Sequence, residues 1–356
     1  MSLLTLLKLL IGATLTAASV LDHHGDHASL EDHFVECQTT AIRDDKLNLR
    51  IASFFIILIV STVGVFSPIL LKKKSSIVTI ERILTVGKFF GIGVILSTAF
   101  VHMLEESFNS FKSPCVPTEF QGFEAWASVF CMIAIMVFQL IEFLAIEHVE
   151  KSGLRNAHAQ NPTTSHEVHN QLTPVKESNS PLQHYHGAGF LESQELTKNI
   201  STLMLELGIV LHSVVAGIAV GIVSSENQVS LLVAVCFHQF FEGIALGTRI
   251  AELTFHRILK SALLGLAFSL TAPLGVAIGI GVRDTYNGNY GVGLIIQAIF
   301  NSFAAGLLLY SAFVGLIAME INYNYVFKQQ SRLFKSVCFA ALYIGIIMMT
   351  VIAKWV

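Results

Sequence analysis

Long runs of apolar residues, separated by short polar stretches, dominate the chain from about residue 49 onward. A helix needs about 20 mostly apolar residues to cross a bilayer, because no water is present there to satisfy exposed backbone groups. Eight segments meet this requirement, at 49–71, 83–107, 124–147, 199–223, 228–249, 260–281, 290–318 and 335–353. The pattern therefore predicts an all-α polytopic membrane protein with eight transmembrane helices.

Composition supports a lipid environment. The chain is 53% hydrophobic and only 13% charged, whereas soluble proteins have about 25% charged residues. The formal net charge of −3 gives no basic surplus of the kind that nucleic-acid binding needs. We therefore expect the lipid bilayer, and not nucleic acid, as a partner.

The segment before the first span has a pattern of its own. Residues 1–19 combine Lys8, an apolar stretch and small residues near the end, which is typical of a signal peptide. The alternative is an uncleaved amphipathic leader. Residues 20–48 then form a polar segment rich in histidine and acidic residues, which we expect to be extracellular.

Lys and Arg residues indicate the orientation. With the N-terminus outside, 15 of the 22 Lys and Arg residues fall on the inner side, and the positive-inside rule then predicts that both termini are extracellular. Spans one to three occupy 49–148, a cytosolic connection occupies 149–198, and spans four to eight occupy 199–356.

The connection at 149–198 is long and polar and contains three prolines, so we expect a mobile loop. Histidines in this loop and in the N-terminal segment either bind metal at the periphery or are simply solvated, and both interpretations stay open. These candidates are His23, His24, His27, His33, His166, His169, His184 and His186.

The five cysteines show no zinc-finger spacing. Cys131, Cys236 and Cys338 lie within expected spans and are most simply small core residues. Cys37 and Cys115 both fall on the expected outer side, where disulfides persist. A bridge between Cys37 and Cys115 is therefore a hypothesis.

The fourth and fifth spans share one pattern, a histidine followed by xxxxGIAxG, which begins at His212 and again at His238. Internal near-duplication of this kind occurs in transporters. Glu242 follows His238 by four residues and shares its helix face. The connection between the spans centres near Glu226, 14 residues after His212 (226 minus 212) and 12 before His238 (238 minus 226). Both histidines therefore lie about 20 Å from one membrane surface.

Two imidazoles and one carboxylate at one depth form an incomplete ligand set, as in exchangeable zinc sites. A single intramembrane histidine is often only an interhelical hydrogen bonder, but three such groups at matched depth favour a central transport site. Ser213 and Gln239 are additional polar ligand candidates. His102 and Glu106, four apart near the outer end of the second span, are candidate entrance residues or a pair that reaches to the interface. Gln297 and Asn301 extend a polar track.

The motif HSVVAG beginning at His212 and the motif HQFFEG beginning at His238 resemble those of the ZIP (Zrt-, Irt-like protein) family of zinc and iron transporters. The resemblance covers nearly the whole chain and is closest in appearance to fungal plasma-membrane zinc transporters. It implies uptake of Zn²⁺ into the cytosol, with zinc as the transported substrate and no resident cofactor. By position, the resemblance implies that His212, His238 and Glu242 are the main metal ligands and that His102 and Glu106 are the histidine and acid at the entrance. A plasma-membrane location and a homodimer are further expectations.

Two departures from the family pattern affect these expectations. Some members have a second metal site at positions that read Ser213, Ala216 and Gln239 here, and none of these is charged. The sequence therefore favours a single transported ion. Glu105 stands where the family often has proline, which changes the expected geometry of the mouth.

Several alternatives stay open. Fe²⁺ or Mn²⁺ could use the same path, because two imidazoles and a carboxylate accept these ions too. Two other classes of protein could use such ligands. One is an intramembrane zinc-dependent hydrolase, although the chain has no HExxH motif, and the other is a metal-sensing receptor. The pattern does not separate a carrier from a gated channel.

Overall fold

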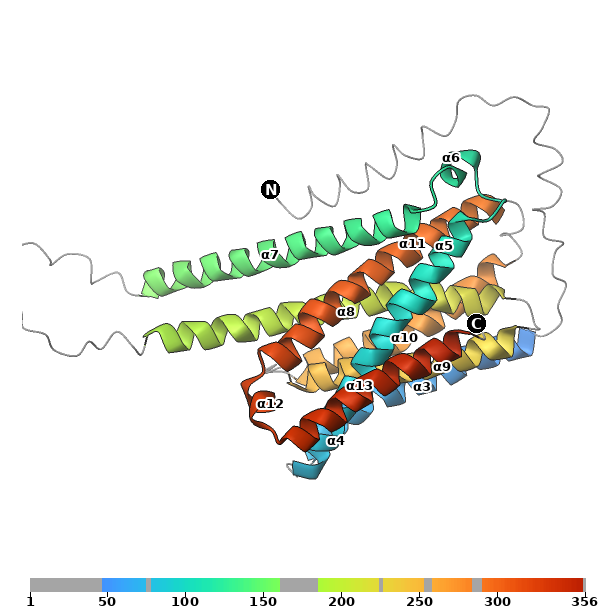
Figure 1. Ribbon diagram of the computed structural model, residues 1–356. Helices are drawn as coiled ribbons and strands as arrows, with labels where there is room; N and C mark the ends of the chain where they lie inside the picture. Colours follow the sequence, from blue (N-terminus) through green and yellow to red (C-terminus); the bar gives the residue numbers. More distant parts are fainter. Residues whose placement is uncertain are drawn as a thin grey trace, which may run out of the picture.

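The computed structural model describes residues 47–74, 78–160, 185–223, 227–252, 258–283 and 290–354. Within these ranges the chain is helical, without strands (Figure 1). Among the described residues, eight helical units are long and apolar enough to cross a membrane. The predicted fold class is confirmed, and the chain is an integral membrane protein.

The helices follow the order of the expected spans. They are α3 (Leu47–Lys74), α4 (Val78–Ser97), η2 (Thr98–Leu104), α5 (Glu105–Phe111), α6 (Thr118–Gln121), α7 (Trp126–Gln160), α8 (Tyr185–Ile222), α9 (Gln228–Glu252), α10 (Ile258–Val282), α11 (Tyr290–Tyr310), η5 (Ser311–Asn322), α12 (Tyr325–Gln329) and α13 (Arg332–Ala353). The second span combines α4, η2 and α5, and the seventh combines α11 and η5.

Two π-helical segments interrupt these spans, at η2 and at η5. Such segments are uncommon and occur frequently at functional sites, because they rotate the side chains that follow them relative to a regular α-helix. His102 lies in η2 and Glu320 lies in η5. Each interruption therefore falls at a position where an ionisable side chain must be aimed into the bundle.

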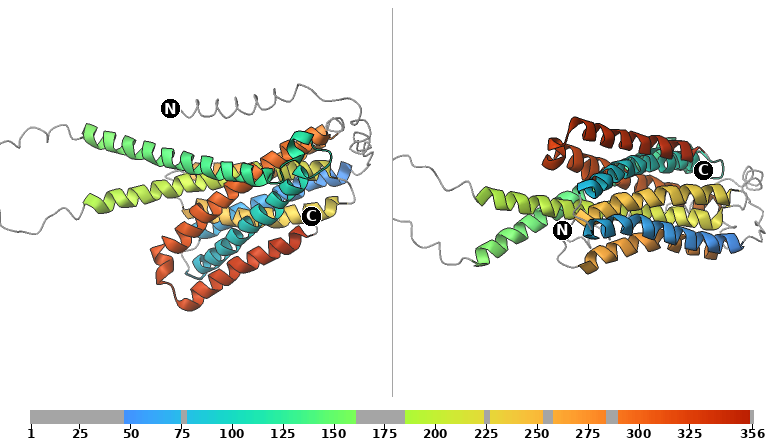
Figure 2. Two further views of the ribbon diagram at one scale, coloured as in Figure 1. Left: turned by 45° about the horizontal axis from the view of Figure 1, so that its top comes forward. Right: turned by 90° about the horizontal axis from the view of Figure 1, so that it is seen from below.

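Helices α7 and α8 are longer than their expected spans. They extend into the connection at 149–198, as far as Gln160 and from Tyr185 onward, because adding residues to an existing helix costs far less than starting one. The two views in Figure 2 show these ends projecting beyond the other helices. The remainder of the connection, the first 46 residues and their predicted signal peptide lie outside the described residues.

The outer surface of the bundle is apolar. Helix α7 exposes Met132 and Met136, and α13 exposes Leu333 and Ile347. The interior contains many polar side chains, among them His212, His238 and Glu242 and the charged groups described below. This inverted distribution suits a bilayer, since lipid tails solvate apolar side chains while polar groups find partners inside the bundle.

Glycines bring the central helices into backbone contact. A methyl group added at Gly217 of α8 would press on the Ala272 carbonyl oxygen of α10, and one added at Gly247 of α9 would press on the Val65 carbonyl oxygen of α3. Small residues at such crossings let membrane helices approach closely. The glycines of the duplicated pattern thus pack α8 against α10 and α9 against α3.

Arg50 of α3 fixes the end of α8. Its Nη1 donates to the Gly221 carbonyl at 2.7 Å and its Nη2 donates to the Val223 carbonyl at 2.7 Å. The last carbonyls of a helix have no partner within the helix, and a cation there also matches the negative end of the helix dipole. This contact fixes the helix that carries His212.

Candidate metal site

Three imidazole rings meet in the middle of the bundle. The ring centroids of His212 and His238 are 5.4 Å apart, and that of His102 lies 6.4 Å from His212 and 5.9 Å from His238. Two rings that share one tetrahedral Zn²⁺ have centroids about 5 Å apart, because each nitrogen lies about 2.0–2.1 Å from the ion. The rings are therefore spaced almost as a metal would hold them.

The ligand atoms of the central residues are buried without hydrogen bonds. Within the described chain, neither ring nitrogen of His212 or of His238 has a partner, and neither carboxylate oxygen of Glu242 has one. The side chains of His238 and Glu242 are fully buried, and His212 is 2% exposed. A buried polar group left unsatisfied costs about 1–3 kcal/mol. Such a cluster is costly to the fold unless it serves a ligand.

Two weaker approaches occur beside this cluster. The Ala234 carbonyl lies near the His238 ring, and the Thr98 hydroxyl lies near the Glu242 carboxylate, but neither has the geometry of a full hydrogen bond. Across the described ranges, no three His, Cys, Asp or Glu side chains already converge as a metal site.

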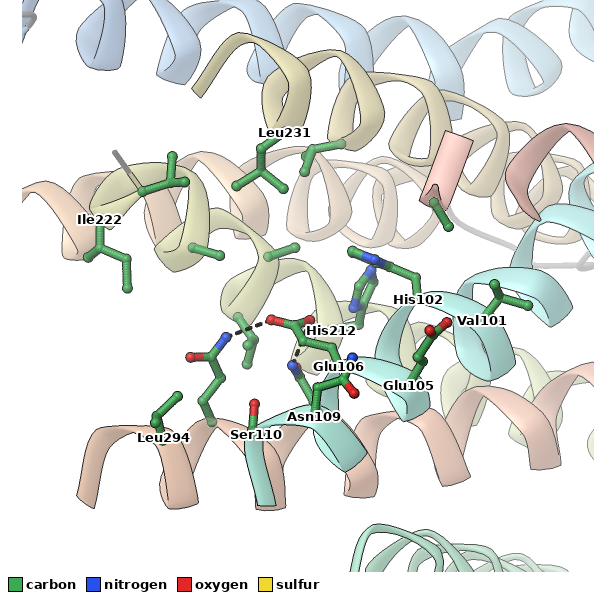
Figure 3. A pocket seen from close by; sticks show the side chains of 18 of the residues that line it. Val101, His102, Glu105, Glu106, Asn109, Ser110, His212, Ile222, Leu231 and Leu294 are labelled. Atoms are coloured by element: carbon green, nitrogen blue, oxygen red, sulfur yellow. Dashed lines mark hydrogen bonds between the residues drawn. The ribbon is translucent and has the colours of Figure 1, made fainter. Parts of the chain in front are cut away.

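A cavity of about 580 Å³ leads to the histidines, and we call it the vestibule. His102 and His212 line its floor, and Leu294, Ile222 and Leu231 line its walls (Figure 3). The walls are formed by the end of the second span and of α8 and by the beginning of α9 and of α11. The vestibule therefore belongs to the end of the bundle that the sequence predicts to be extracellular.

Glu106 projects into the vestibule and is held by two amides. Gln297 Nε2 donates to its Oε1 at 2.8 Å, and Asn301 Nδ2 donates to its Oε2 at 3.0 Å (Figure 3). Both donors belong to α11 and both are neutral, so they orient the carboxylate without cancelling its charge. Each oxygen keeps a lone pair for a cation. Glu105, the adjacent acid, is exposed and also lines the vestibule.

The structure joins two groups that the sequence treated separately. His102 was expected near the mouth, apart from the central pair, yet its ring faces both His212 and His238. Gln239 lies beside Ser213, whose Oγ donates to its Oε1 at 3.3 Å. The entrance and central candidates therefore form one continuous polar region.

The remaining predicted residues lie mostly outside the described chain. This applies to His23, His24, His27, His33, Cys37, His166, His169 and His184, whereas His186 falls at the beginning of α8. Cys115 is disulfide-bonded, and Cys131, Cys236 and Cys338 are free thiols. Because Cys37 is not described, its pairing with Cys115 stays a prediction.

Sequence reasoning missed a second cluster of buried charges, at the other end of the bundle. Lys88, Arg249 and Glu320 are at most 4% exposed and form ion pairs with one another and with Glu252. The available signal was the position of Lys88 inside an expected span, together with acidic residues at the corresponding end of two other spans.

The comparisons with known proteins agree with this architecture. Residues 47–353 match the family described as ZIP Zinc transporter. The chain is 31% identical over 313 residues to Zinc-regulated transporter 1 of Candida albicans, covering 88% of this chain and 62% of that protein. It is 27% identical over 421 residues to Zinc-regulated transporter 2 of Saccharomyces cerevisiae, covering 93% and 99%. It is 32% identical over 317 residues to Fe(2+) transport protein 1 of Arabidopsis thaliana, covering 87% and 86%.

Fold and cavity together define a polytopic membrane protein with a vestibule lined by polar side chains between its helices. The chain belongs to the ZIP family of zinc transporters, which confirms the resemblance seen at the two histidine motifs. It is therefore a divalent metal transporter and not an enzyme.

Proposed function

We propose that this protein carries Zn²⁺ into the cytosol through a site formed by His212, His238 and Glu242, with His102 as a further ligand. The observation that supports this most is the cluster of buried ligand atoms without partners in the described structure. Imidazole and carboxylate are ligands that Zn²⁺ accepts in tetrahedral sites. A bound ion would satisfy the groups that the fold leaves unsatisfied.

The ion enters through the vestibule in this proposal. Glu106 attracts it and supplies a first oxygen ligand, and His102 receives it at the vestibule floor. Gln297 and Asn301 act as positioning residues, because they hold the Glu106 carboxylate in one orientation. Ser213 and Gln239 contribute polar contacts beside the site, and a single ion is carried at a time.

Orientation and location complete the proposal. Both termini lie outside and the protein resides in the plasma membrane, as the distribution of Lys and Arg and the fungal relatives favour. Capture of metal by the N-terminal histidines, a role for the loop histidines and a homodimer stay predictions. We expect alternating access, in which one helix group moves against another.

Fe²⁺ is the second candidate substrate. A relative that is 32% identical is named Fe(2+) transport protein 1, and a site of imidazoles and one carboxylate accepts either ion. Competition by Fe²⁺ and Mn²⁺ against radioactive zinc, in the same cells, would rank the three ions.

Radioactive zinc uptake tests the proposal. We expect His238→Ala and Glu242→Ala each to abolish uptake while the protein still reaches the cell surface, since each variant removes a ligand of the central site. His148→Ala, which removes an exposed histidine at the end of the third span, is the matched control and should transport normally. Normal uptake by both site variants would contradict the assignment.

A further inference from the structure

The second charge cluster joins three helical units far apart in the sequence. Lys88 Nζ of α4 lies 2.7 Å from Glu252 Oε1 of α9 and 2.7 Å from Glu320 Oε2 of η5. Arg249 Nη1 of α9 lies 3.0 Å from Glu320 Oε1. Two cations and two anions thus balance one another in the interior. We call these four residues the inner cluster.

The inner cluster lies at the end of the bundle opposite the vestibule. A second cavity of about 200 Å³ lies beside it, lined by Lys88, Thr248, Glu252 and Glu320. Its walls are formed by the beginning of α4 and the ends of α9 and η5. The vestibule is formed by the opposite ends of the same spans. The two cavities therefore lie at opposite ends of the bundle.

Helical register places the inner cluster in line with the metal site. Arg249 follows Glu242 by seven residues and His238 by eleven, spacings that return to the same face of an α-helix after two and three turns. The axial distance from Glu242 to Arg249 is about 10 Å at 1.5 Å per residue. An ion that leaves His238 and Glu242 along this face of α9, away from the vestibule, meets the inner cluster directly.

The cluster is only partly satisfied. Within the described residues, Nε and Nη2 of Arg249 are buried and have no hydrogen-bond partner. The Asn324 amide adds a contact to Glu320 Oε2 at 3.3 Å. A half-satisfied buried ionic network stabilises its arrangement less than a complete one would. Such a network can hold a path closed and still allow it to open.

We propose that Lys88, Arg249, Glu252 and Glu320 form an ion-pair gate that closes the metal path on the cytosolic side while the vestibule is open. This gate depends on the metal path proposed above. The closed gate blocks a departing cation in two ways, by filling the space with packed side chains and by presenting the positive charges of Lys88 and Arg249. Inward opening separates α9 from α4 and η5, and therefore breaks these ion pairs.

Accessibility of two reporter cysteines tests the gate. Ala219→Cys lines the vestibule and Thr248→Cys lines the inner cavity, so a membrane-impermeant maleimide reaches the first in intact cells and the second in inside-out vesicles. The labelling rates are measured in a zinc chelator, with the rate of the chain without a reporter subtracted.

Glu320→Gln leaves Arg249 buried without its anionic partner and so disfavours the closed gate. We expect labelling at Ala219→Cys to slow by about tenfold and labelling at Thr248→Cys to rise, because removing one partner of a buried ion pair shifts an equilibrium by roughly a hundredfold or more. Glu147→Gln breaks the exposed pair between Glu147 and Lys151 on α7 and, as the matched control, should change neither rate.

A second variant separates gating from folding. Arg249→Gln combined with Glu320→Gln removes one charge of each sign and leaves Lys88 paired with Glu252. We expect this double variant to fold at normal abundance. Labelling at Ala219→Cys should slow and labelling at Thr248→Cys should rise, each by a smaller factor than in Glu320→Gln. Wild-type labelling at both reporters in this double variant would overturn the gate. Since no zinc is present, this result is independent of whether His238 and Glu242 carry the metal.

Discussion

The two buried polar clusters of this transporter differ in how their charges are satisfied. At the central metal site, Glu242 and the rings of His212 and His238 have no hydrogen-bond partners among the described residues. In the inner cluster, Glu320 accepts from both Lys88 and Arg249. Burial is nearly complete for all of these residues, and only Glu252 of the inner cluster is partly exposed. The first arrangement is therefore suited to receiving a ligand, whereas the second is suited to holding helices together.

The same substitution at both clusters should have opposite effects on stability. Glu320→Leu leaves two buried cations short of a partner, and we expect the free energy of unfolding to fall by about 3–5 kcal/mol. Glu242→Leu removes an unsatisfied carboxylate, and we expect the free energy of unfolding to rise by about 1–3 kcal/mol. Denaturant unfolding of the purified protein in detergent with a zinc chelator measures both free energies of unfolding. A change of the same sign in the two variants would contradict the proposed difference between the clusters.

Uptake kinetics should distinguish the vestibule from the site beneath it. Asn301→Leu removes one of the two donors that orient Glu106, and hydrogen bonds to charged groups contribute about 1.5–3 kcal/mol. We expect the half-saturating zinc concentration to rise about tenfold while the maximal rate stays near normal, because His212, His238 and Glu242 are untouched. Asn301→Gln keeps an amide and should recover part of the loss. A fall in maximal rate alone would place Asn301 elsewhere in the transport cycle.

The smallest effect is expected at Ser213. Its contact with Gln239 is long, at 3.3 Å, and neither side chain is charged. We expect Ser213→Ala to change the half-saturating zinc concentration by less than about twofold, since a neutral hydrogen bond contributes only about 1 kcal/mol. Loss of most uptake in this variant would instead make Ser213 an essential ligand and would reopen the question of a second ion.

Much of this architecture could be predicted from sequence because it depends on local periodicity. Apolar runs located all eight spans, and counting residues from one connection placed His212 and His238 at one depth, where the rings are 5.4 Å apart. The π-helical segments could not be predicted, because they depend on packing and not on a local pattern. The expected second span ended at 107 whereas the helix continues to Phe111, so His102 was placed too near the mouth.

The inner cluster shows why the rest was missed. Lys88 and Glu320 are 232 positions apart (320 minus 88), and their contact depends on how the second and seventh spans pack. The expected seventh span ended at 318, which left Glu320 outside it. Lys88 and Arg249 were used only as evidence of orientation, although each is almost fully buried. Burial of a charge at a span end is a tertiary property that hydropathy does not report.

The amide-held carboxylate of Glu106 has a consequence for ion valence. Its donors, Gln297 and Asn301, carry no charge, so when ionised Glu106 and Glu242 together contribute two negative charges around three neutral rings, apart from the exposed Glu105 of the vestibule. A doubly charged ion makes this interior electroneutral. Sodium or potassium would leave one negative charge uncompensated there and a trivalent ion would leave one positive charge, and both outcomes are penalised in a medium of low dielectric constant. Selection by valence thus follows from the count of formal charges, before any preference among divalent metals is exercised by the geometry of the ligands.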